Sequence, residues 1–388
     1  MIETRQHSSI AEIPREAWDA LWPGDAEGWA YYRCCEQAMP AGFAVSYLAT
    51  YADVALVAAA PVFHTHYELY SSVRGPVRSM LDAIARRFPS FLRLGVTGLG
   101  SPLVDRCHIG LREGFTPEQR SAVLGSLLDG LAQSAGQNAH RLIAVKDLED
   151  GLAVALEGDL QAHGFAKVRS LPNAYLDLPF GSWEAFLKSL SSPSARSYLK
   201  RKERGLSRLR VEFPEEIGAL SPRLHALYEQ TRTQSQGDYG VFEDLDPMYF
   251  DEVKRACGDR AQFMLCWLDD RLVSFQLLLA GDRELIGKLI GMDYTVARDL
   301  NLYFVNLNQA IRLAIARGIP HVRMGNTAYG VKMIYGARLV THWINFKHRN
   351  AGVNWLLRKL APLIDYERND PELAKMRQQE AGTKEAAG

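Results

Sequence analysis

Three short apolar runs joined by tight connections constrain the fold of this chain most. The runs are Gln262–Leu268, Leu272–Ala280 and Leu285–Met292. Asp269-Asp270 and Gly281-Asp282 connect them, and connections this short predict an antiparallel meander of three strands. A segment with apolar residues at helical spacing follows over 302–317 and stops at Gly318. The second half of the chain must therefore form a mostly antiparallel sheet with a helix against it.

Further elements surround this meander. Before it, capping residues and prolines predict helices over 183–190, 193–209, 222–234 and 247–257. After it we expect a strand over 321–324, a loop rich in Gly, Asn and Tyr over 325–330, a short helix over 331–335 and a last strand over 340–346. The helix that begins near Ser192 is strongly basic between 196 and 210.

The first half shows a second alternation of strands and helices. Strands are predicted over 43–51, 54–64, 94–99, 141–145, 165–169 and 174–178, and helices over 117–136 and 152–163. Thr116-Pro117-Glu118-Gln119 is a capping box with Pro at the first helical position. A chain of 388 residues exceeds one ordinary core. We therefore expect domains over 1–172 and 173–365, and a flexible charged tail over 366–388.

The order of elements in the second half resembles the GNAT acetyltransferase fold, in the tandem branch of FemAB-type aminoacyltransferases and CelD-like acetyltransferases. The residues that carry the likeness are Ser197 to Arg208, Gly291-Met292-Asp293, Leu302-Tyr303, Ala310 to Gly318, and Gly325 to Gly336 with Tyr335-Gly336-Ala337. The resemblance implies an α/β (α+β) chain of two tandem GNAT-like domains, each a mixed, mostly antiparallel sheet flanked by helices. It also implies an acyltransferase.

The turn before the 302–317 helix departs from the wider GNAT pattern. Ordinary GNAT enzymes place a Gly-rich turn there, whose backbone N–H groups hold the pyrophosphate of CoA. Here 294–301 contains no Gly. Arg298, Asn301, Leu302 and Tyr303 remain the candidates for binding a donor phosphate. The FemAB-type branch also lacks the full motif, so the resemblance allows acyl-CoA or aminoacyl-tRNA as the donor.

Candidate site residues lie in two segments. Tyr239, Asn326, Tyr329 and Lys332 are candidates for binding substrate, since loops on a rigid scaffold commonly carry function. For catalysis, Asp293 and Glu243 are candidate bases and Tyr335 is a candidate proton donor to the leaving group. Each also fits an ordinary structural role: capping or surface exposure for the carboxylates, a turn for the loop, and packing for Tyr335.

Charge and composition limit the partners. Lys plus Arg and Asp plus Glu both total 45, so no global field attracts nucleic acid or anionic membranes. This balance favours acyl-CoA over aminoacyl-tRNA, and leaves the basic segment 196–210 as either a phosphate-binding surface or a solvated helix face. The five cysteines lack zinc-binding spacing, so we expect no metal.

We expect a cytoplasmic protein without an integral membrane segment, because the start of the chain lacks the pattern of a signal peptide and the apolar runs are about half of the ~20 residues that span a bilayer. The expected function is N-acyl transfer from acyl-CoA, or a related activated ester, to a small-molecule amine. An aminoacyl-tRNA-dependent, amide-forming transferase and a non-catalytic binding protein are the alternatives. The sequence leaves the oligomeric state open.

Overall fold

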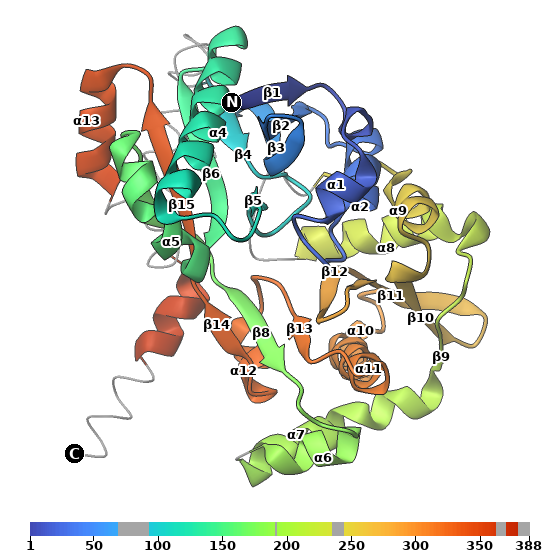
Figure 1. Cartoon of the computed structure of the whole chain (residues 1–388). Coiled ribbons are helices and arrows are strands. Elements are labelled where there is room, and N and C mark those ends of the chain that lie inside the picture. Colours follow the sequence, from blue (N-terminus) through green and yellow to red (C-terminus); the bar gives the residue numbers. More distant parts are fainter. Residues whose placement is uncertain (69–92, 191, 235–243, 362–369, 379–388) are drawn as a thin grey trace, which may run out of the picture.

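Two mixed sheets, each flanked by helices, make up the computed structural model of this protein (Figure 1). It describes residues 1–68, 93–190, 192–234, 244–361 and 370–378. Within each sheet, all strand pairs are antiparallel except one: β4 with β6 in the first sheet, and β12 with β13 in the second. This confirms the expected α/β architecture with two mixed, mostly antiparallel sheets.

The first sheet has the order β1-β2-β3-β4-β6-β15-β7, with β5 paired to β3. Its strands are β1 (Ile2–His7), β2 (Phe43–Ala52), β3 (Ala55–Glu68), β4 (Arg93–Leu99), β5 (Gly110–Leu111), β6 (Leu142–Glu149), β7 (Ala166–Arg169) and β15 (His342–His348). The second sheet has the order β14-β8-β13-β12-β11-β10-β9. Its strands are β8 (Asn173–Asp177), β9 (Arg210–Glu212), β10 (Ala261–Leu268), β11 (Arg271–Ala280), β12 (Glu284–Met292), β13 (His321–Arg323) and β14 (Arg338–Val340).

Helices cover the sheets, and the side chains of Thr116, Ser182 and Ser192 form N-caps as their positions predict. Those of the first half are α1 (Arg15–Asp19), α2 (Trp29–Gln37), α4 (Pro117–Gln137) and α5 (Asp150–Ala162). Those of the second half are α6 (Trp183–Ser189), α7 (Pro193–Lys202), α8 (Ser221–Gln234), α9 (Tyr249–Cys257), α10 (Ala297–Leu300), α11 (Leu302–Ala316), α12 (Tyr329–Ile334) and α13 (Ala351–Leu360). Thr116 and Gln119 form the capping box of α4, as predicted from their spacing.

The two halves exchange strands. β8 directly follows the first half in sequence, yet it pairs with β13 and β14 in the second sheet. β15 comes near the end of the chain, yet it lies between β6 and β7 in the first sheet. The strand predicted over 340–346 thus divides between the two sheets, because β14 ends at Val340 and β15 begins at His342.

A shared apolar core joins the halves. Trp18 and Tyr31 of the first half and Tyr249 and Phe275 of the second belong to one buried cluster. At its centre the hydroxyl groups of Tyr31 and Tyr249 lie 2.8 Å apart. Burial of large aromatic side chains on both sides makes this a core contact rather than a polar domain interface.

The C-terminal segment also packs. Residues 371–378 are helical, Asp370 caps them through the N–H groups of Glu372 and Leu373, and Leu373 is buried. This part of the predicted tail therefore contacts the folded body. Within the described residues, no helix combines the length and apolar character needed to cross a bilayer.

Candidate active site

The second sheet opens between β12 and β13. The two strands pair only from Glu284–Ile286 to His321–Arg323. Just beyond this pairing, the register of β12 against β11 shifts by one residue, so that Lys288 forms a bulge. Bulges bend and twist a strand, and they commonly re-aim a side chain beside a functional site. The rest of β12, up to Met292, thus leaves its β13-facing edge without a strand partner among the described residues.

Lys332 lies at the end of β13 where the opening begins. A Cβ added at Gly325, two residues after β13, would lie 3.8 Å from its Nζ. Lys332 is buried on α12. Burial lowers the pKa of its amine to about 7, although the negative charges of Glu372 and Asp105 act to raise it. Glu372 comes from the C-terminal helix and accepts a 2.7 Å hydrogen bond from the N–H of Gly330. An amine with a pKa near neutrality can both carry charge and exchange a proton.

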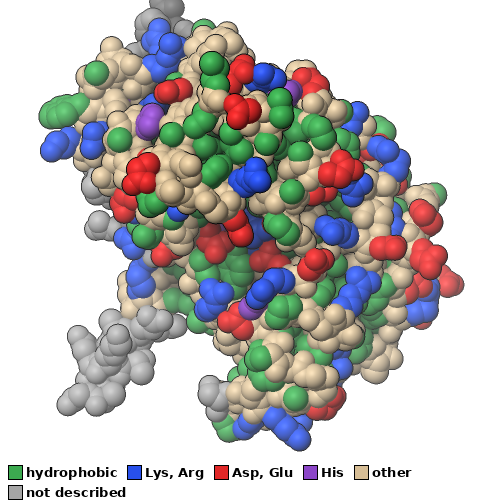
Figure 2. Space-filling view, in the orientation of Figure 1, with side chains coloured by type: hydrophobic (Ala, Val, Ile, Leu, Met, Phe, Trp, Pro, Cys, Tyr) green, Lys and Arg blue, Asp and Glu red, His purple; other side chains and the backbone are tan. Residues whose placement is uncertain are grey.

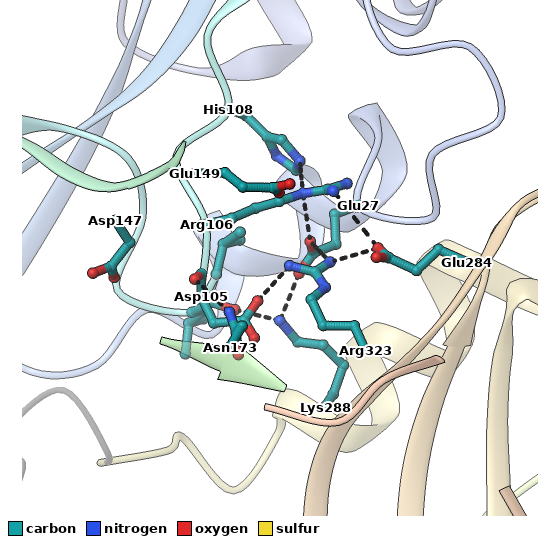
Figure 3. A network of polar contacts seen from close by, with 12 residues as sticks. Glu27, Asp105, Arg106, His108, Asp147, Glu149, Asn173, Glu284, Lys288 and Arg323 are labelled. Atoms are coloured by element: carbon teal, nitrogen blue, oxygen red, sulfur yellow. Dashed lines mark hydrogen bonds and ion pairs between the residues drawn. The ribbon is translucent and has the colours of Figure 1, made fainter. Parts of the chain in front are cut away.

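A buried network of charges lies between the two sheets (Figure 3). The fully buried guanidinium of Arg323 pairs with Glu27 and Asp105, each at 2.5 Å, and with Glu284 at 3.2 Å. Lys288, aimed by the bulge, donates to Glu27 at 2.7 Å. The network therefore ties the opening in the second sheet to the first half.

The network continues into the first half through Arg106. Arg106 pairs with Asp25 and lies 3.6 Å from Glu284, and its Nε donates to His108 at 3.0 Å. Burial raises the pKa of Glu284 despite the neighbouring guanidinium groups of Arg323 and Arg106. Burial would also raise the pKa of Glu27, but Arg323 and Lys288 hold it below its ordinary value. Desolvated carboxylates whose pKa values move apart are a common mark of functional sites.

A basic cleft of about 430 Å³ lies at the N-terminal end of α11. Its lining residues are Arg201, Lys202, Arg204, Gly205, Arg208, Asp299, Leu300 and Asn301. Asn301 has φ of +52° and does not cap α11; instead its Oδ1 accepts a 2.8 Å hydrogen bond from Lys202 Nζ. A Cβ at Gly205 would collide with the carbonyl oxygen of Leu300, so glycine is needed for this close packing. The cleft combines four cations with an uncapped helix N-terminus, an arrangement suited to phosphate.

The predicted catalytic residues do not lie in one place. Asp293, after β12, accepts from both the N–H and the hydroxyl of Thr295 and pairs with Arg223 at 3.4 Å. Burial opposes ionisation of Asp293, but Thr295 and nearby arginines keep its pKa below the ordinary value. Tyr335 is buried and donates to Asn308 at 2.6 Å. Glu243 lies outside the described residues.

The predicted binding residues are also spread out. Asn326 and Lys332 share the end of β13, whereas Tyr329 is buried and its hydroxyl donates to the carbonyl of Pro172 at 3.0 Å. Tyr239 lies outside the described residues. Of the predicted phosphate ligands, Asn301 lines the basic cleft, Leu302 and Tyr303 begin α11, and Arg298 is exposed and absent from the lining.

Sequence reasoning missed the charge network. Arg323 lies in the short strand predicted over 321–324. A charged residue between the apolar Val322 and Met324 was the signal that could have identified it. Glu27, Asp105 and Arg106 come from segments without periodicity, and their meeting with β12 and β13 depends on how the halves pack. Asp25, Glu27 and His108 place ligand atoms within 4.8 Å of one another, a spacing that could hold a metal ion. Arg106, Lys288 and Arg323 already pair with this cluster, so we assign no metal to it.

Comparison with known proteins identifies the class. Residues 193–333 match the family described as Acetyltransferase (GNAT) domain, and no curated protein matches the chain. The structure is similar to that of FemX, with a TM-score of 0.59 and 12% identity, over 92% of this chain and 100% of FemX. It is also similar to a tandem GNAT protein from the clavulanic acid biosynthesis pathway, with a TM-score of 0.50 and 10% identity, over 90% and 99% of the two chains.

A third similar structure is a C-terminal DUF2156 domain from Agrobacterium fabrum, of a protein assigned as a lysylphosphatidylglycerol synthetase. Its TM-score is 0.52 with 11% identity, over 93% of this chain and 97% of that one. At these identities the likeness concerns the fold. The fold is that of two tandem GNAT-like domains, and the acetyltransferase (GNAT) domain matched over residues 193–333 supports a transferase.

Proposed function

We propose that this protein transfers an acyl group from an activated ester to the nitrogen of a small-molecule amine. Acyl-CoA is the first candidate donor. The observation that carries the proposal is the buried amine of Lys332 at the point where β12 and β13 diverge. An activated carbonyl placed in this opening would meet a charged donor, Lys332, on one side and, on the other, the backbone edge of β12 that has no strand partner among the described residues. Such preorganised donors stabilise the oxyanion of a tetrahedral intermediate.

The proposed chemistry needs positioning more than a strong base. The neutral acceptor amine attacks the carbonyl carbon, a C–N bond forms, and the C–S bond of a thioester (or the C–O bond of an ester) breaks. The proton lost by the amine ends on the leaving group. Lys332, with a pKa of about 7, can supply positive charge to the intermediate and relay this proton. Tyr335 would serve as proton donor only after releasing Asn308.

The basic cleft supports a donor that carries phosphate. Arg201, Lys202, Arg204 and Arg208 surround it, and the uncapped N-terminus of α11 adds backbone N–H groups. These groups take the place of the Gly-rich turn that residues 294–301 lack. The cleft is small and local, which suits the diphosphate and the single further phosphate of acyl-CoA. The chain as a whole has no net charge.

Aminoacyl-tRNA is the second candidate donor. The Gly-free turn, the likeness to FemX and the likeness to a protein assigned as a lysylphosphatidylglycerol synthetase favour it. Both candidate donors carry an activated carbonyl and phosphates in one molecule. The same opening and cleft would therefore serve either reaction, and the donor must be identified by experiment.

Transfer assays with matched variants test the proposal. Purified protein is incubated with acetyl-CoA, long-chain acyl-CoA or charged tRNA and a mixture of amines, and new amides are detected by mass spectrometry. We expect amides with one donor class, and a loss of at least a hundredfold in rate for Lys332→Met, in line with the removal of one oxyanion donor. The control Arg317→Gln, on the exposed end of α11, should retain the wild-type rate. Donor binding without amide formation would instead identify a non-catalytic binding protein.

A further inference from the structure

A second cleft, of about 620 Å³, lies in the first half of the chain. It is bounded by the segment that follows Asp105, the first turn of α4, the end of β6 and the start of α5. Figure 2 shows the middle of this face hollowed, with acidic and basic side chains gathered around the hollow. A volume of this size suits a small organic ligand.

The cleft occupies the place in the first half that the donor opening occupies in the second. β4 and β6 form the parallel pair of the first sheet as β12 and β13 do in the second, and β6 continues beyond Val145 without β4 as β12 continues beyond Ile286 without β13. α4 precedes β6 as α11 precedes β13, and α5 follows β6 as α12 follows β13. The two halves thus present corresponding openings.

The first opening differs from the second at its helix N-terminus. The hydroxyl of Thr116 and the amide of Gln119 form a complete capping box on α4, and Pro117 has no N–H to offer. The N-terminus of α11 has no such cap. A donor diphosphate therefore finds no backbone cradle on α4, and the cleft suits a different ligand from the donor.

Unpaired charges of both signs line this cleft. Arg120, half-buried on α4, and Arg112 and Glu113, exposed at the mouth, have no ion pair among the described residues. Glu149, at the end of β6, accepts a 3.3 Å hydrogen bond from the hydroxyl of Tyr175 and forms no ion pair with the residues that the structure describes. Arg106, by contrast, is already held by Asp25 and Glu284.

Apolar side chains form part of the walls of the cleft. They include Trp22, Ile109, Phe115 and Leu152. A ligand with a single charge would leave one of the two sets of charged groups unmatched. A ligand with an apolar body, one positive end and one negative end would match the apolar side chains, the acidic groups and the basic groups of the cleft.

We infer that this cleft binds the acceptor: an amine with an apolar body and an anionic group, either a carboxylate or a phosphate. Arg120 holds the anion and Glu149 holds the amine. Glu149 contacts Tyr175 of β8, and Arg106 in the floor of the cleft reaches Glu284 of β12, so the acceptor lies against the second half. The term acceptor rests on the transfer reaction proposed above, whereas binding itself does not.

Calorimetric titration without any donor tests the site. The probes are the dipeptide leucyl-phenylalanine, the same dipeptide with its carboxylate amidated, the same dipeptide with its amine acetylated, and 2-aminoethyl phosphate. We expect the unmodified dipeptide or 2-aminoethyl phosphate to bind, which separates carboxylate from phosphate as the anion. Each blocked dipeptide should bind about tenfold to a hundredfold more weakly than the free one, the usual effect of losing a charged hydrogen bond.

Variants connect this binding to the cleft. Arg120→Gln should weaken the free dipeptide or 2-aminoethyl phosphate by about tenfold to a hundredfold, and should abolish the preference for the free carboxylate over its amide. Glu149→Gln should abolish the preference for the free amine over its acetylated form. Arg141→Gln, exposed and away from the cleft, should bind as wild type.

The outcomes separate this inference from the proposed function. Equal affinity of wild type and Arg120→Gln, or binding of neither the free dipeptide nor 2-aminoethyl phosphate, would overturn the acceptor site while leaving acyl transfer open to the assay above. Specific binding that responds to Arg120 and Glu149, in a protein that forms no amide with any donor, would leave the site standing and remove the transferase.

Discussion

Arg323 is the residue on which the contact between the halves depends most. Its side chain is fully buried and faces three carboxylates, those of Glu27, Asp105 and Glu284. Removing one partner from a buried charge cluster leaves the others uncompensated, which typically costs about 3–5 kcal/mol. We therefore expect Arg323→Gln to lower the free energy of unfolding by about this amount, measured by urea denaturation.

A surface arginine provides the comparison. Arg338 pairs with Asp177, and about half of each side chain is exposed to solvent. Arg338→Gln should change the free energy of unfolding by less than about 1 kcal/mol, as exposed ion pairs do. Equal effects of the two substitutions would show that the network contributes no more than a surface pair.

Burial of the Lys332 amine should lower the free energy of unfolding of the protein. Its pKa is about 7 in the folded protein and 10.5 when unperturbed, so between these values the unfolded chain binds more protons. Stability due to this residue therefore rises with pH from about 7 to 10.5, and is lowest below 7. Lys332→Met removes the buried amine and should raise the free energy of unfolding at pH 6.5 by about 1–5 kcal/mol.

The pH dependence of that gain is the sharper measurement. At pH 9 the gain should be smaller than at pH 6.5, because the folded wild-type protein is then mostly neutral at Lys332. Urea denaturation of both proteins at the two pH values gives the difference. A gain independent of pH would mean that Lys332 keeps an ordinary pKa.

At the scale of elements, the 3₁₀ turn over Glu203–Arg208, which joins α7 to β9, should govern donor affinity. Arg204 and Arg208 line the basic cleft and have no ion pair among the described residues. Phosphate contacts of this kind weaken with salt because bound counterions are released. We expect the double variant Arg204→Gln/Arg208→Gln to bind the donor about tenfold or more weakly, with a shallower dependence on salt, in calorimetric titrations. An unchanged affinity and salt slope would place the phosphates elsewhere.

Most elements could be predicted from local sequence, because their signals are local. The meander β10–β12, the helix α11 with Gly318 after it, and the capping box of α4 all follow from spacing and turn residues. β1 was missed because its sequence is mostly polar, and α13 was missed although the side chain of Asn350 caps it. The basic helix was predicted to reach Leu209, but α7 ends at Lys202 and continues as a 3₁₀ turn to Arg208.

The candidate site was less accessible from sequence. Lys332 and Asn301 were found because they stand in segments that resemble a known family. Arg323 and its partners were not, since four segments from both halves converge there and only the packing of the halves brings them together. The place of β15 in the first sheet could not be inferred from local pattern for the same reason.

At the scale of the whole molecule, the exchanged strands should make the chain unfold as one unit. β15 completes the first sheet, β8 completes the second, and the core around Tyr31 and Tyr249 belongs to both halves. Neither half retains its sheet once the other unfolds. We expect a single calorimetric transition whose van't Hoff and calorimetric enthalpies agree. Two separated transitions would mean that the halves are independently stable.

The central claim is that the opening beside Lys332 delivers an activated carbonyl to an amine. The most direct measurement follows donor and product in one reaction, by counting donor consumed and amide formed in the first turnovers of the wild-type protein. The account predicts one amide for each donor consumed, with a rate that collapses in Lys332→Met while the variant remains folded. Donor that is hydrolysed without amide formation, or that persists with every amine offered, would contradict it.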